Sequence, residues 1–484
     1  MLRHQFYERL LANHDTIRND ARTAAKTMGL NKFNGQLGLS TSSSSCPGQL
    51  AKPVWDALNE ARKTKVLPAR IVEDQLRELV KETYGDDFDC VALNTCESAL
   101  RVTFDTLLAP PIMARGYTYR TRFIAPYTLD DEYVAGYGRP FPPKYKNLFA
   151  DRSVSAGETS VEAKALPNVD AVFVKLVGAK YEVHGINSNP RPLLADVEAE
   201  KSAEKIGAVA SRHAETLSGF ETLSDDTPGF GYGAKDANGV PILQESIGRL
   251  AAEYDVPYIV DAARAVPIVG IHPRKVHATV TMYSMDKTVH GITSGLLIGR
   301  EEEMVPIRKA VGVHGGRLAA TSTHGKAAFS FADPGRDAVI SQIAILKTLK
   351  ERPETIRGPV DEYYSVLNEE VAGLEPSWLR DGLVITKSYH VGCVEMNYEH
   401  TWDEGRFGIP IFSIEDNFSN TNLLASALTE MGIFPPPIYG GNIQLTSGMG
   451  DLDEDGKLIR ENVVLSIRGL IQAMNIVCKN AGLK

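Results

Sequence analysis

The sequence predicts an α/β protein whose large domain holds a mostly parallel sheet and is followed by a smaller C-terminal α/β domain. Three observations predict this class. The chain has 484 residues, more than one compact core usually holds. Between about residues 70 and 300, segments with helical spacing alternate with short apolar runs, as in parallel sheets. After about residue 335 a helical segment leads away from this alternation, which indicates a second domain.

The elements of the large domain follow in order. Residues 70–84 predict a helix, because their apolar side chains recur three or four positions apart. The stretch "CVALNTCESALRVTFDTLLA" at 90–109 predicts a short buried strand, a turn of small residues at 94–97 and a helix from about Ser98. An amphipathic helix around 243–251 precedes a strand that ends near Asp261. Two more strands are expected in "ATVTMYSM" at 278–285 and "GLLIGR" at 295–300.

The rest of the chain divides around this alternation. Residues 1–50 are interpreted as an N-terminal arm, 51–335 as the large domain, and 336–484 as a linker helix with a small C-terminal domain. In the small domain, strands are expected near 383–396 and 462–468. The segments 111–150, rich in Tyr, Phe, Pro and Arg, and 217–241, rich in Gly, Asp and Pro, are interpreted as insertions, and long ordered loops of this kind often carry function.

Composition excludes several classes of protein. The net charge of −9 argues against a general nucleic-acid surface. No apolar run is long enough to cross a bilayer, and the charged N-terminus lacks a signal-peptide core, so a cytoplasmic protein is expected. The five cysteines form no CxxC pair, which disfavours zinc sites and disulfide frameworks. No GxGxxG opens a helix after a strand, which makes a dinucleotide-binding dehydrogenase a poor alternative.

One lysine stands out in "YSMDKTVHGITSGLLIGR" at 283–300. Lys287 follows the end of one predicted strand, and Asp261 ends another strand 26 residues earlier. In open α/β sheets, ligands bind at the carboxyl ends of strands. Pyridoxal 5′-phosphate (PLP) needs this pair, since its aldehyde forms a Schiff base with a lysine and its ring nitrogen needs an acidic partner. An ordinary surface lysine and a structural aspartate remain the alternatives.

A phosphate group would find donors close by. The turn "NTCESA" at 94–99 lies between a predicted strand and a predicted helix, where backbone N–H groups at the helix start favour an anion. Ser284, three residues before Lys287, could add a hydroxyl, although a simple turn serine is an equal alternative.

The combined pattern resembles fold-type I PLP enzymes, the aspartate aminotransferase superfamily. The run "VDAARAVPIVGIHP…VTMYSMDKTVHGITSGLLIGREEEM" is similar to the selenocysteine synthase-related branch, which includes ammonia-lyase-type enzymes acting on sugar acids. The segment "GGRLAATSTHGKAAFSFA" at 315–332 resembles the same branch, whereas "DAAR" is shared with tyrosine phenol-lyase, tryptophanase and threonine aldolase. The resemblance implies a seven-stranded-type, mostly parallel sheet, a smaller C-terminal domain and a homodimer or higher homo-oligomer with a site at the subunit interface.

The resemblance also implies roles for particular residues. Lys287 would hold the cofactor and move the α-proton of the substrate, and Asp261 would pair with the pyridine nitrogen. Arg264 would lie near the phenolic oxygen of the ring and His213 beside the cofactor. The positions of the phosphate turn are matched by Thr95, Cys96, Glu97 and Ser98.

For the substrate, the resemblance places Arg468, in "ENVVLSIRG", where the small domain often offers an arginine to the carboxylate, and a guanidinium suits that bidentate contact. From the aromatic 111–150 segment, Tyr117 or Tyr119 could stack on the cofactor, and Tyr119 is our candidate at the substrate. His290 is interpreted as structural or near the phosphate of a neighbouring subunit. Cys393 lies at about the distance from the lysine seen in cysteine desulfurases, but it alternates inside a strand-like run and is interpreted as core.

The predicted function is that of a PLP-dependent lyase on a small amino acid. Both the branch and "DAAR" point to a carbanion at Cα followed by α,β-elimination or β-replacement, with cleavage of a carbon–oxygen, carbon–nitrogen, carbon–sulfur or carbon–carbon bond. Elimination would release ammonia. An aldolase, a decarboxylase and an aminotransferase remain alternatives, as does a non-catalytic PLP-fold subunit. A selenocysteine synthase proper would need a surface for tRNA, which the acidic balance disfavours. No metal site and no membrane partner are expected.

Overall fold

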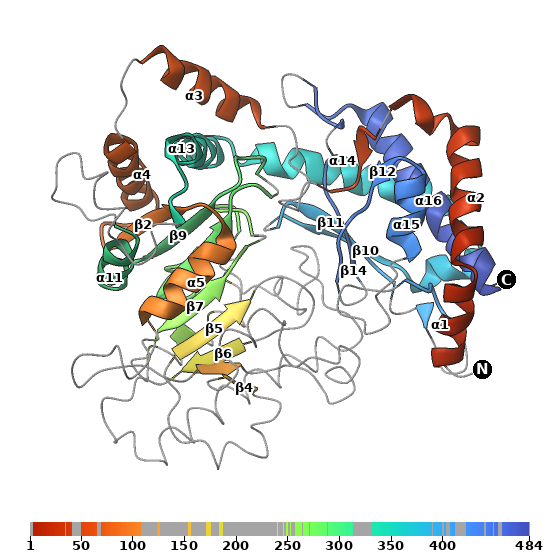
Figure 1. Cartoon of the computed structure of the whole chain (residues 1–484), viewed down its shortest axis with the longest axis horizontal. Coiled ribbons are helices and arrows are strands. Elements are labelled where there is room, and N and C mark those ends of the chain that lie inside the picture. The colour runs from red at the N-terminus through yellow and green to blue at the C-terminus, as the bar shows by residue number, and fades with distance from the viewer. Residues whose placement is uncertain are drawn as a thin grey trace.

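Most of the fold is visible in the computed structural model shown in Figure 1. It describes residues 3–33, 35–40, 50–64, 69–107, 257–263, 265–270, 272–287, 289–312, 332–389, 391–398, 401–402, 407–411, 423–439, 442–448, 450–453 and 457–483, with the short strands 123–125, 153–155, 171–175 and 183–186 and positions 240, 245, 248, 249 and 252.

The central element is a mostly parallel sheet with the strand order β2-β9-β8-β7-β5-β3-β4, and β6 pairs with β5 outside this path. Only β9 and β6 run against the other described strands of this sheet. The strands are β2 (Phe88–Leu93), β3 (Phe123–Ala125), β4 (Ser153–Ser155), β5 (Ala171–Lys175), β6 (Val183–Ile186), β7 (Tyr258–Asp261), β8 (Val280–Ser284) and β9 (Gly295–Arg300). The predicted mostly parallel sheet and the strands around 90, 260, 280 and 297 are confirmed.

The central strands are apolar on both faces of the sheet, so helices must cover both faces to keep these side chains from water. Every residue of β2 and β8 is buried, as expected of strands that lie between two layers of helices. Alternate residues of β2, Phe88, Cys90 and Ala92, lie in one core with α4 and α13. The helices of this domain are α3 (Lys52–Lys63), α4 (Ala69–Tyr84), α5 (Cys96–Leu107), α11 (Glu301–Val311) and α13 (Arg336–Glu351). The predicted helices at 70–84 and after 336 are confirmed.

A second core joins the two ends of the chain. It contains side chains from α1 (Arg3–Ala12) and α2 (His14–Met28) together with side chains from the C-terminal part of the chain. Strand β1 (Leu37–Gly38) pairs in parallel with β12 (Ile433–Phe434). The other elements are α14 (Glu354–Glu370), β10 (Val384–Ser388), β11 (Cys393–Asn397), α15 (Leu423–Glu430), β13 (Ile438–Tyr439), β14 (Asn442–Leu445) and α16 (Arg460–Ala481), and β10, β11, β14 and β13 form an antiparallel sheet.

The boundary between the two cores runs through α14. Its first turn contributes Ile356 to the large-domain core, whereas Val360 and Tyr363 belong to the second core. We propose that residues 3–39 form one domain with the part of the chain after about 357, rather than a separate arm. The mostly parallel sheet and the smaller second domain agree with the fold-type I class that the sequence resembles.

One predicted strand is wrong. Residues 462–468 belong to α16, a helix of 22 residues. Its buried side chains include Val463, Ile467, Leu470 and Met474, which recur every three or four positions. The short run "VVLSI" contains three β-branched residues and a leucine, so it suggests a strand when it is taken without the residues that follow.

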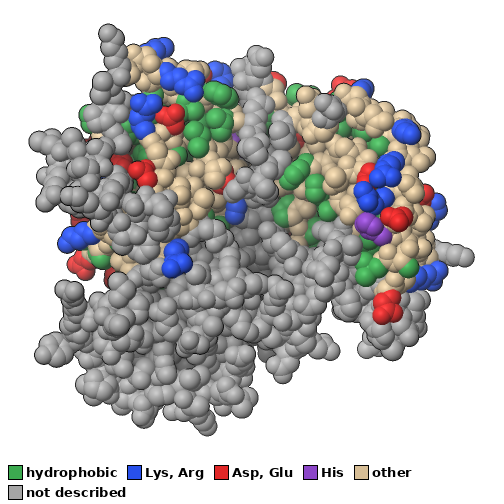
Figure 2. All heavy atoms as spheres, viewed as in Figure 1, with side chains coloured by type: hydrophobic (Ala, Val, Ile, Leu, Met, Phe, Trp, Pro, Cys, Tyr) green, Lys and Arg blue, Asp and Glu red, His purple; other side chains and the backbone are tan. Residues whose placement is uncertain are grey.

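No helix in the described part of the chain is both long and apolar enough to cross a bilayer. Figure 2 shows lysine, arginine and acidic side chains interspersed over the described part of the visible face.

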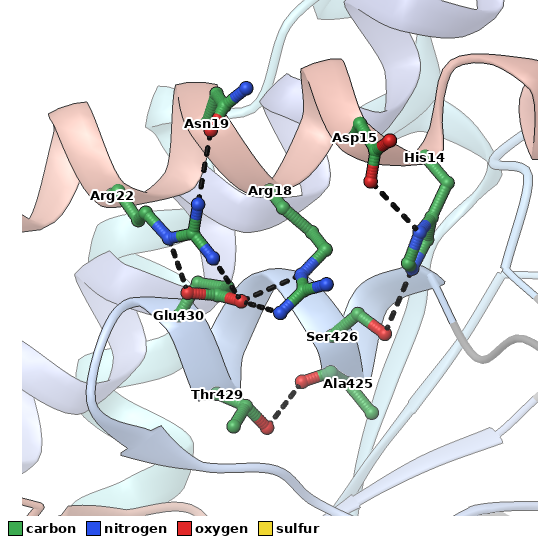
Figure 3. A network of polar contacts seen from close by, with 9 residues as sticks. All are labelled: His14, Asp15, Arg18, Asn19, Arg22, Ala425, Ser426, Thr429 and Glu430. Atoms are coloured by element: carbon green, nitrogen blue, oxygen red, sulfur yellow. Dashed lines mark hydrogen bonds and ion pairs between the residues drawn. The ribbon is translucent and has the colours of Figure 1, made fainter.

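A polar network holds the N-terminal helix α2 against α15 (Figure 3). Glu430 accepts hydrogen bonds from Arg18 Nε at 2.6 Å and from Arg22 Nε at 2.6 Å. The hydrogen bond from Arg22 lowers the pKa of the Glu430 carboxyl most. Burial opposes it, and the hydrogen bond from Arg18 and the charges of both arginines lower the pKa further, so the net pKa lies below its usual value.

Replacing Glu430 with glutamine should lower the melting temperature slightly, by about 1–2 °C at low salt, because exposed arginines are well solvated on their own. The difference should shrink in about 0.5 M NaCl, where surface charges are screened. Differential scanning fluorimetry at both salt concentrations measures it, with the exposed Glu8→Gln as the matched control. A difference that is the same at both salt concentrations would contradict an electrostatic origin.

A buried carboxyl lies in the second core. Asp451 is fully buried, and its Oδ2 accepts hydrogen bonds from the Tyr363 hydroxyl and, at 2.6 Å, from the Gly448 amide. Its Oδ1 has no hydrogen-bond partner among the described residues. Burial raises the pKa of this carboxyl to about 6, although the two hydrogen bonds act in the opposite direction.

Asp451→Asn should therefore remove a pH-dependent loss of stability. The pKa of the Asp451 carboxyl is higher in the folded chain than its usual value of about 3.9. The protonated carboxyl therefore does not destabilise the fold below about pH 4, and the free energy of unfolding falls as pH rises from about 4 through about 6. The loss amounts to roughly 3 kcal/mol at pH 7. Urea unfolding at pH 4.5 and pH 7.5 should show the variant gaining on the wild type at the higher pH, and the exposed Asp381→Asn should show no such change. An equal difference at both pH values would exclude titration of Asp451.

Candidate functional site at the carboxyl edge of the sheet

The carboxyl ends of β2, β7 and β8 meet at one edge of the sheet. Gly295, the first residue of β9, pairs with Leu93 at the end of β2 and with Ser284 at the end of β8. Strand β7 lies beside β8 in parallel, with Asp261 opposite Met282. The turns that leave β2 and β8, which carry Thr95 and Lys287, therefore start on either side of the first residue of β9. The juxtaposition predicted for the phosphate turn and the lysine turn is present in the backbone.

The turn after β2 is the start of helix α5. The Thr95 side-chain oxygen accepts the backbone N–H of Ser98 at 3.0 Å, and the Thr95 hydroxyl donates to Ser98 Oγ at 3.1 Å. Thr95 is thus the N-cap residue, and the helix starts at Cys96 rather than at Ser98. Backbone N–H groups of this first turn point out of the helix start, where they favour an anion.

Strand β9 approaches this helix start so closely that only glycine fits at its first position. A Cβ atom on Gly295 would lie 2.5 Å from the backbone oxygen of Thr95. The carbonyl oxygen of Gly295 also accepts a hydrogen bond from Gln342 Nε2 of α13 at 3.1 Å. The position of the turn after β2 is therefore fixed by the neighbouring strand.

The turn after β8 holds Lys287 in a closed, half-buried loop. The His290 amide donates to the Lys287 carbonyl oxygen at 3.0 Å, and the Gly291 amide donates to the Met285 carbonyl oxygen at 2.9 Å. The Met285 amide in turn donates to Ser294 O at 2.9 Å. Three backbone hydrogen bonds thus fix the chain on both sides of Lys287.

The residue before the lysine is a buried carboxyl that the sequence reasoning missed. The Ser284 hydroxyl donates to Asp286 Oδ1 at 2.6 Å, and Asp286 is 7% exposed. Asp286 Oδ2 has no hydrogen-bond partner among the described residues. In this arrangement the Ser284 hydroxyl proton is committed to Asp286, which favours an orienting role for Ser284 over a phosphate contact. A carboxyl inside an otherwise apolar run, beside Lys287, is the signal that could have identified Asp286.

Other predicted site residues lie partly or wholly outside the described residues. The backbone of Asp261 ends β7 as predicted, whereas its side chain is not among those described. The Glu97 backbone lies in the first turn of α5, and its side chain is likewise not described. The positions outside the described residues are Arg264, His213, Tyr117 and Tyr119.

Arg468 lies on the protein surface and not at the predicted substrate site. The residue lies on α16 rather than on a strand, and its side chain is 55% exposed. Arg468 Nε donates to Glu370 Oε2 of α14 at 2.8 Å. This is an ion pair between two helices on the protein surface, so we do not carry Arg468 forward as a substrate ligand.

Two further residues have packing or linking positions. Cys393 is fully buried in β11, which confirms its interpretation as core. His290 Nε2 lies 3.3 Å from Ser447 Oγ, which follows β14, and the His290 carbonyl oxygen accepts the Ala51 amide at 2.9 Å. His290 therefore links the Lys287 turn to the second domain.

The residues at this edge suit PLP. The half-buried Lys287 lies on a fixed turn, and the capped start of α5 offers backbone and hydroxyl donors to a phosphate. Strand β7, which lies between β8 and β5, ends in Asp261. A dianionic phosphate matches the partial positive charge of a helix start, and an aldehyde matches an amine.

Comparisons with known proteins give remote similarities only. No protein-family model matches the sequence, and no curated protein matches it. A solved structure of ureidoglycine-glyoxylate aminotransferase from Bacillus subtilis is 13% identical, with 90% of this chain and 92% of that chain covered and a TM-score of 0.44. Aspartate aminotransferase from Thermus thermophilus with maleate is 15% identical, with 94% and 96% covered and a TM-score of 0.46. Cysteine desulfurase from Thermococcus onnurineus NA1 is 15% identical, with 86% and 90% covered and a TM-score of 0.41.

With identities of this order and TM-scores below 0.5, we take neither an activity nor a substrate from these similarities. The fold class follows from the strand order and from the two separate cores of the chain itself.

Proposed function

We propose that the chain is a PLP-dependent enzyme acting on an amino acid, and that it is a lyase that performs α,β-elimination or β-replacement. The observation that best supports PLP as the cofactor is the register of the central sheet. It brings the capped start of α5, the Lys287 turn and the end of β7 to one edge. The choice of a lyase rests on the sequence resemblance described above.

Each residue of the site has a distinct task in this proposal. The Lys287 amine holds the cofactor and moves the proton at Cα of the substrate. The Ser98 hydroxyl and the backbone N–H groups at the start of α5 bind the phosphate, and Thr95 orients Ser98 through the two hydrogen bonds between them. Asp261 keeps the ring nitrogen protonated. When bound, PLP supplies an electron sink for the negative charge that develops at Cα.

Asp286 has a supporting task. Its buried carboxylate is held by the Ser284 hydroxyl and lies next to Lys287 in the chain. Through this hydrogen bond Asp286 would orient the end of β8, from which the Lys287 turn leaves the sheet.

We also propose a cytoplasmic homodimer or higher homo-oligomer, as the resemblance implies. Size-exclusion chromatography with light scattering measures the mass in solution, and a monomer at all concentrations would contradict this part of the proposal.

The test of the cofactor is the visible absorbance of the purified protein with and without added PLP. Bound PLP should give a saturable band near the visible range at about one equivalent per chain. The reaction is then tested with amino acids that carry a β-leaving group. An enzyme that performs α,β-elimination should release keto acid and ammonia without a second substrate. An enzyme that performs β-replacement should need an added nucleophile and release a new amino acid without ammonia, whereas an aminotransferase should need a keto-acid acceptor and release no ammonia. A protein that stays colourless with added PLP would overturn the cofactor assignment.

A further inference from the structure

A cavity of about 290 Å³ lies between the two cores and beside the Lys287 turn, and no residue of α5 lines it. Helices α3, α13 and α14, in the upper part of Figure 1, form three of its walls, and residues 445–447 at the end of β14 form another. Its apolar lining comes from both domains. Val54 and Leu349 belong to the large-domain core, and Val360 and Leu445 belong to the second core.

The polar part of the lining carries a positive charge. Lys52 and Asp56 both line the cavity and neutralise one another in an ion pair of 3.0 Å. Arg352, at the end of α13, also lines the cavity, and within the described part of the chain its guanidinium has no carboxylate partner. The cavity therefore combines an apolar floor with one guanidinium whose charge is not balanced by a neighbouring side chain.

We propose that this cavity is a regulatory site for a small monocarboxylate with an apolar body. The guanidinium offers two parallel N–H donors to a carboxylate, and the side chains of the two cores offer a dry surface to about ten carbon atoms. Arg352 is exposed, so water solvates its guanidinium when no ligand is bound. A carboxylate adds a charge-assisted hydrogen bond that a neutral ligand lacks, and a dicarboxylate would place its second charge on the apolar floor.

The regulatory effect follows from two residues of the lining. Val289 and His290 line the cavity, and they belong to the turn that carries Lys287. His290 joins this turn to Ser447 of the second domain and to Ala51 at the start of α3. A ligand that contacts both domains here favours one arrangement of the turn, and it changes turnover to the extent that this arrangement differs in activity. This effect on turnover rests on the proposed function, whereas binding does not.

Binding is tested by isothermal titration calorimetry of the full chain with 3-phenylpropionate and 4-methylpentanoate, and with 3-phenylpropanamide as the neutral match. The two carboxylates should bind with one site per chain and a Kd of roughly 0.1–1 mM, and the amide at least about tenfold more weakly. Arg352→Gln should weaken carboxylate binding by about tenfold or more. Thr348→Phe should also weaken it, because Thr348 lines the cavity and a larger side chain would fill it. The matched control is Lys347→Gln, an exposed cation on the same helix that does not line the cavity.

Three results would overturn the site: no saturable binding of either carboxylate up to about 10 mM, equal binding of the amide, or wild-type affinity in both cavity variants. If the protein binds PLP and turns over, each carboxylate should change the rate in the wild type and not in Arg352→Gln. Binding without a change in rate would overturn the regulatory role alone. A protein that stays colourless with added PLP but still binds the carboxylates would contradict the proposed function and support the regulatory site as a binding site.

Discussion

Lys287→Ala should abolish the absorbance band of bound PLP and lower turnover by at least about 1,000-fold. The lysine amine is the only group that we assign both to holding the cofactor and to moving the proton at Cα, and loss of a positioned acid–base group typically costs 10²–10⁴-fold. The measurement is the absorbance spectrum together with keto-acid release under the same conditions. The alanine should be tolerated structurally, because the turn is fixed by the backbone hydrogen bonds of Met285, His290 and Gly291.

Lys275→Ala is the matched control, since Lys275 is an exposed lysine in a turn that precedes β8. Its spectrum and turnover should equal those of the wild type. A Lys287→Ala protein that keeps both the band and the activity would assign the cofactor to another lysine, and Lys287 would then be a half-buried lysine in a structural turn.

The second large effect is expected for Asp89→Ala in strand β2. Asp89 is 1% exposed and accepts hydrogen bonds from Arg77 Nε at 2.7 Å, Arg77 Nη2 at 2.9 Å and Arg308 Nη1. Arg308 is itself buried, so removing the carboxylate leaves a guanidinium without its counter-charge in the interior. Breaking a buried ion pair in this way costs about 3–5 kcal/mol of unfolding free energy. Urea unfolding at pH 7.5 measures the loss.

The pH dependence of this loss has a defined sign. Burial by itself raises the pKa of Asp89, but the hydrogen bond from Arg77 and the charges of Arg308 and Arg77 outweigh it and hold the pKa below its usual range. A lowered pKa gives stability that is present above about pH 4 and is lost as pH falls through the folded value. The difference between wild type and variant should therefore shrink on acidification.

The double variant Asp89→Leu/Arg308→Met distinguishes two causes of the stability loss, an uncompensated charge on Arg308 and a loss of packing at Asp89. Replacing a buried ion pair with apolar groups of similar size is often neutral or stabilising, because neither charge then needs to be desolvated. Arg77, the other partner of Asp89, keeps Asp74 at 3.5 Å and partial contact with solvent. The double variant should recover most of the stability that Asp89→Ala loses. If the double variant is as unstable as the single one, the loss comes from packing rather than from an uncompensated charge.

The central strands and the position of the lysine were predictable from the sequence, because each strand is apolar on both faces and stands out from its surroundings. Val280 to Ser284 and Gly295 to Arg300 are short, largely apolar runs bounded by turns. The convergence of Thr95 and Lys287 could be inferred because parallel strands end at the same edge.

The elements that were missed depend on contacts that a short stretch of sequence does not contain. Helix α16 contains five consecutive residues typical of a strand, and its helical period emerges only over its full length. The buried stripe of α2 consists of Ile17, Ala21 and Ala25, and two alanines give a weak signal of burial. Without α16 as a helix, Arg468 was assigned to the wrong kind of position.

The pairing of Ser284 with Asp286 could not be predicted for another reason. Residues two apart in an extended strand point to the same side, but Asp286 lies beyond the end of β8, where the backbone turns. Whether the serine hydroxyl meets a phosphate or the neighbouring carboxyl is decided by two side-chain rotations, which no sequence pattern specifies.

The pairing of β1 with β12 has a consequence for how the chain is made in the cell. Leu37 leaves the ribosome early, and its partner Ile433 follows about 400 residues later, which at ordinary translation speeds is a delay of roughly 20–80 s. During this delay the large domain has all of its own segments and can fold, whereas the apolar stripe of α2 has no permanent partner. A nascent chain stalled near residue 350 should therefore bind chaperones through residues 3–39, and release of the finished chain should end that binding.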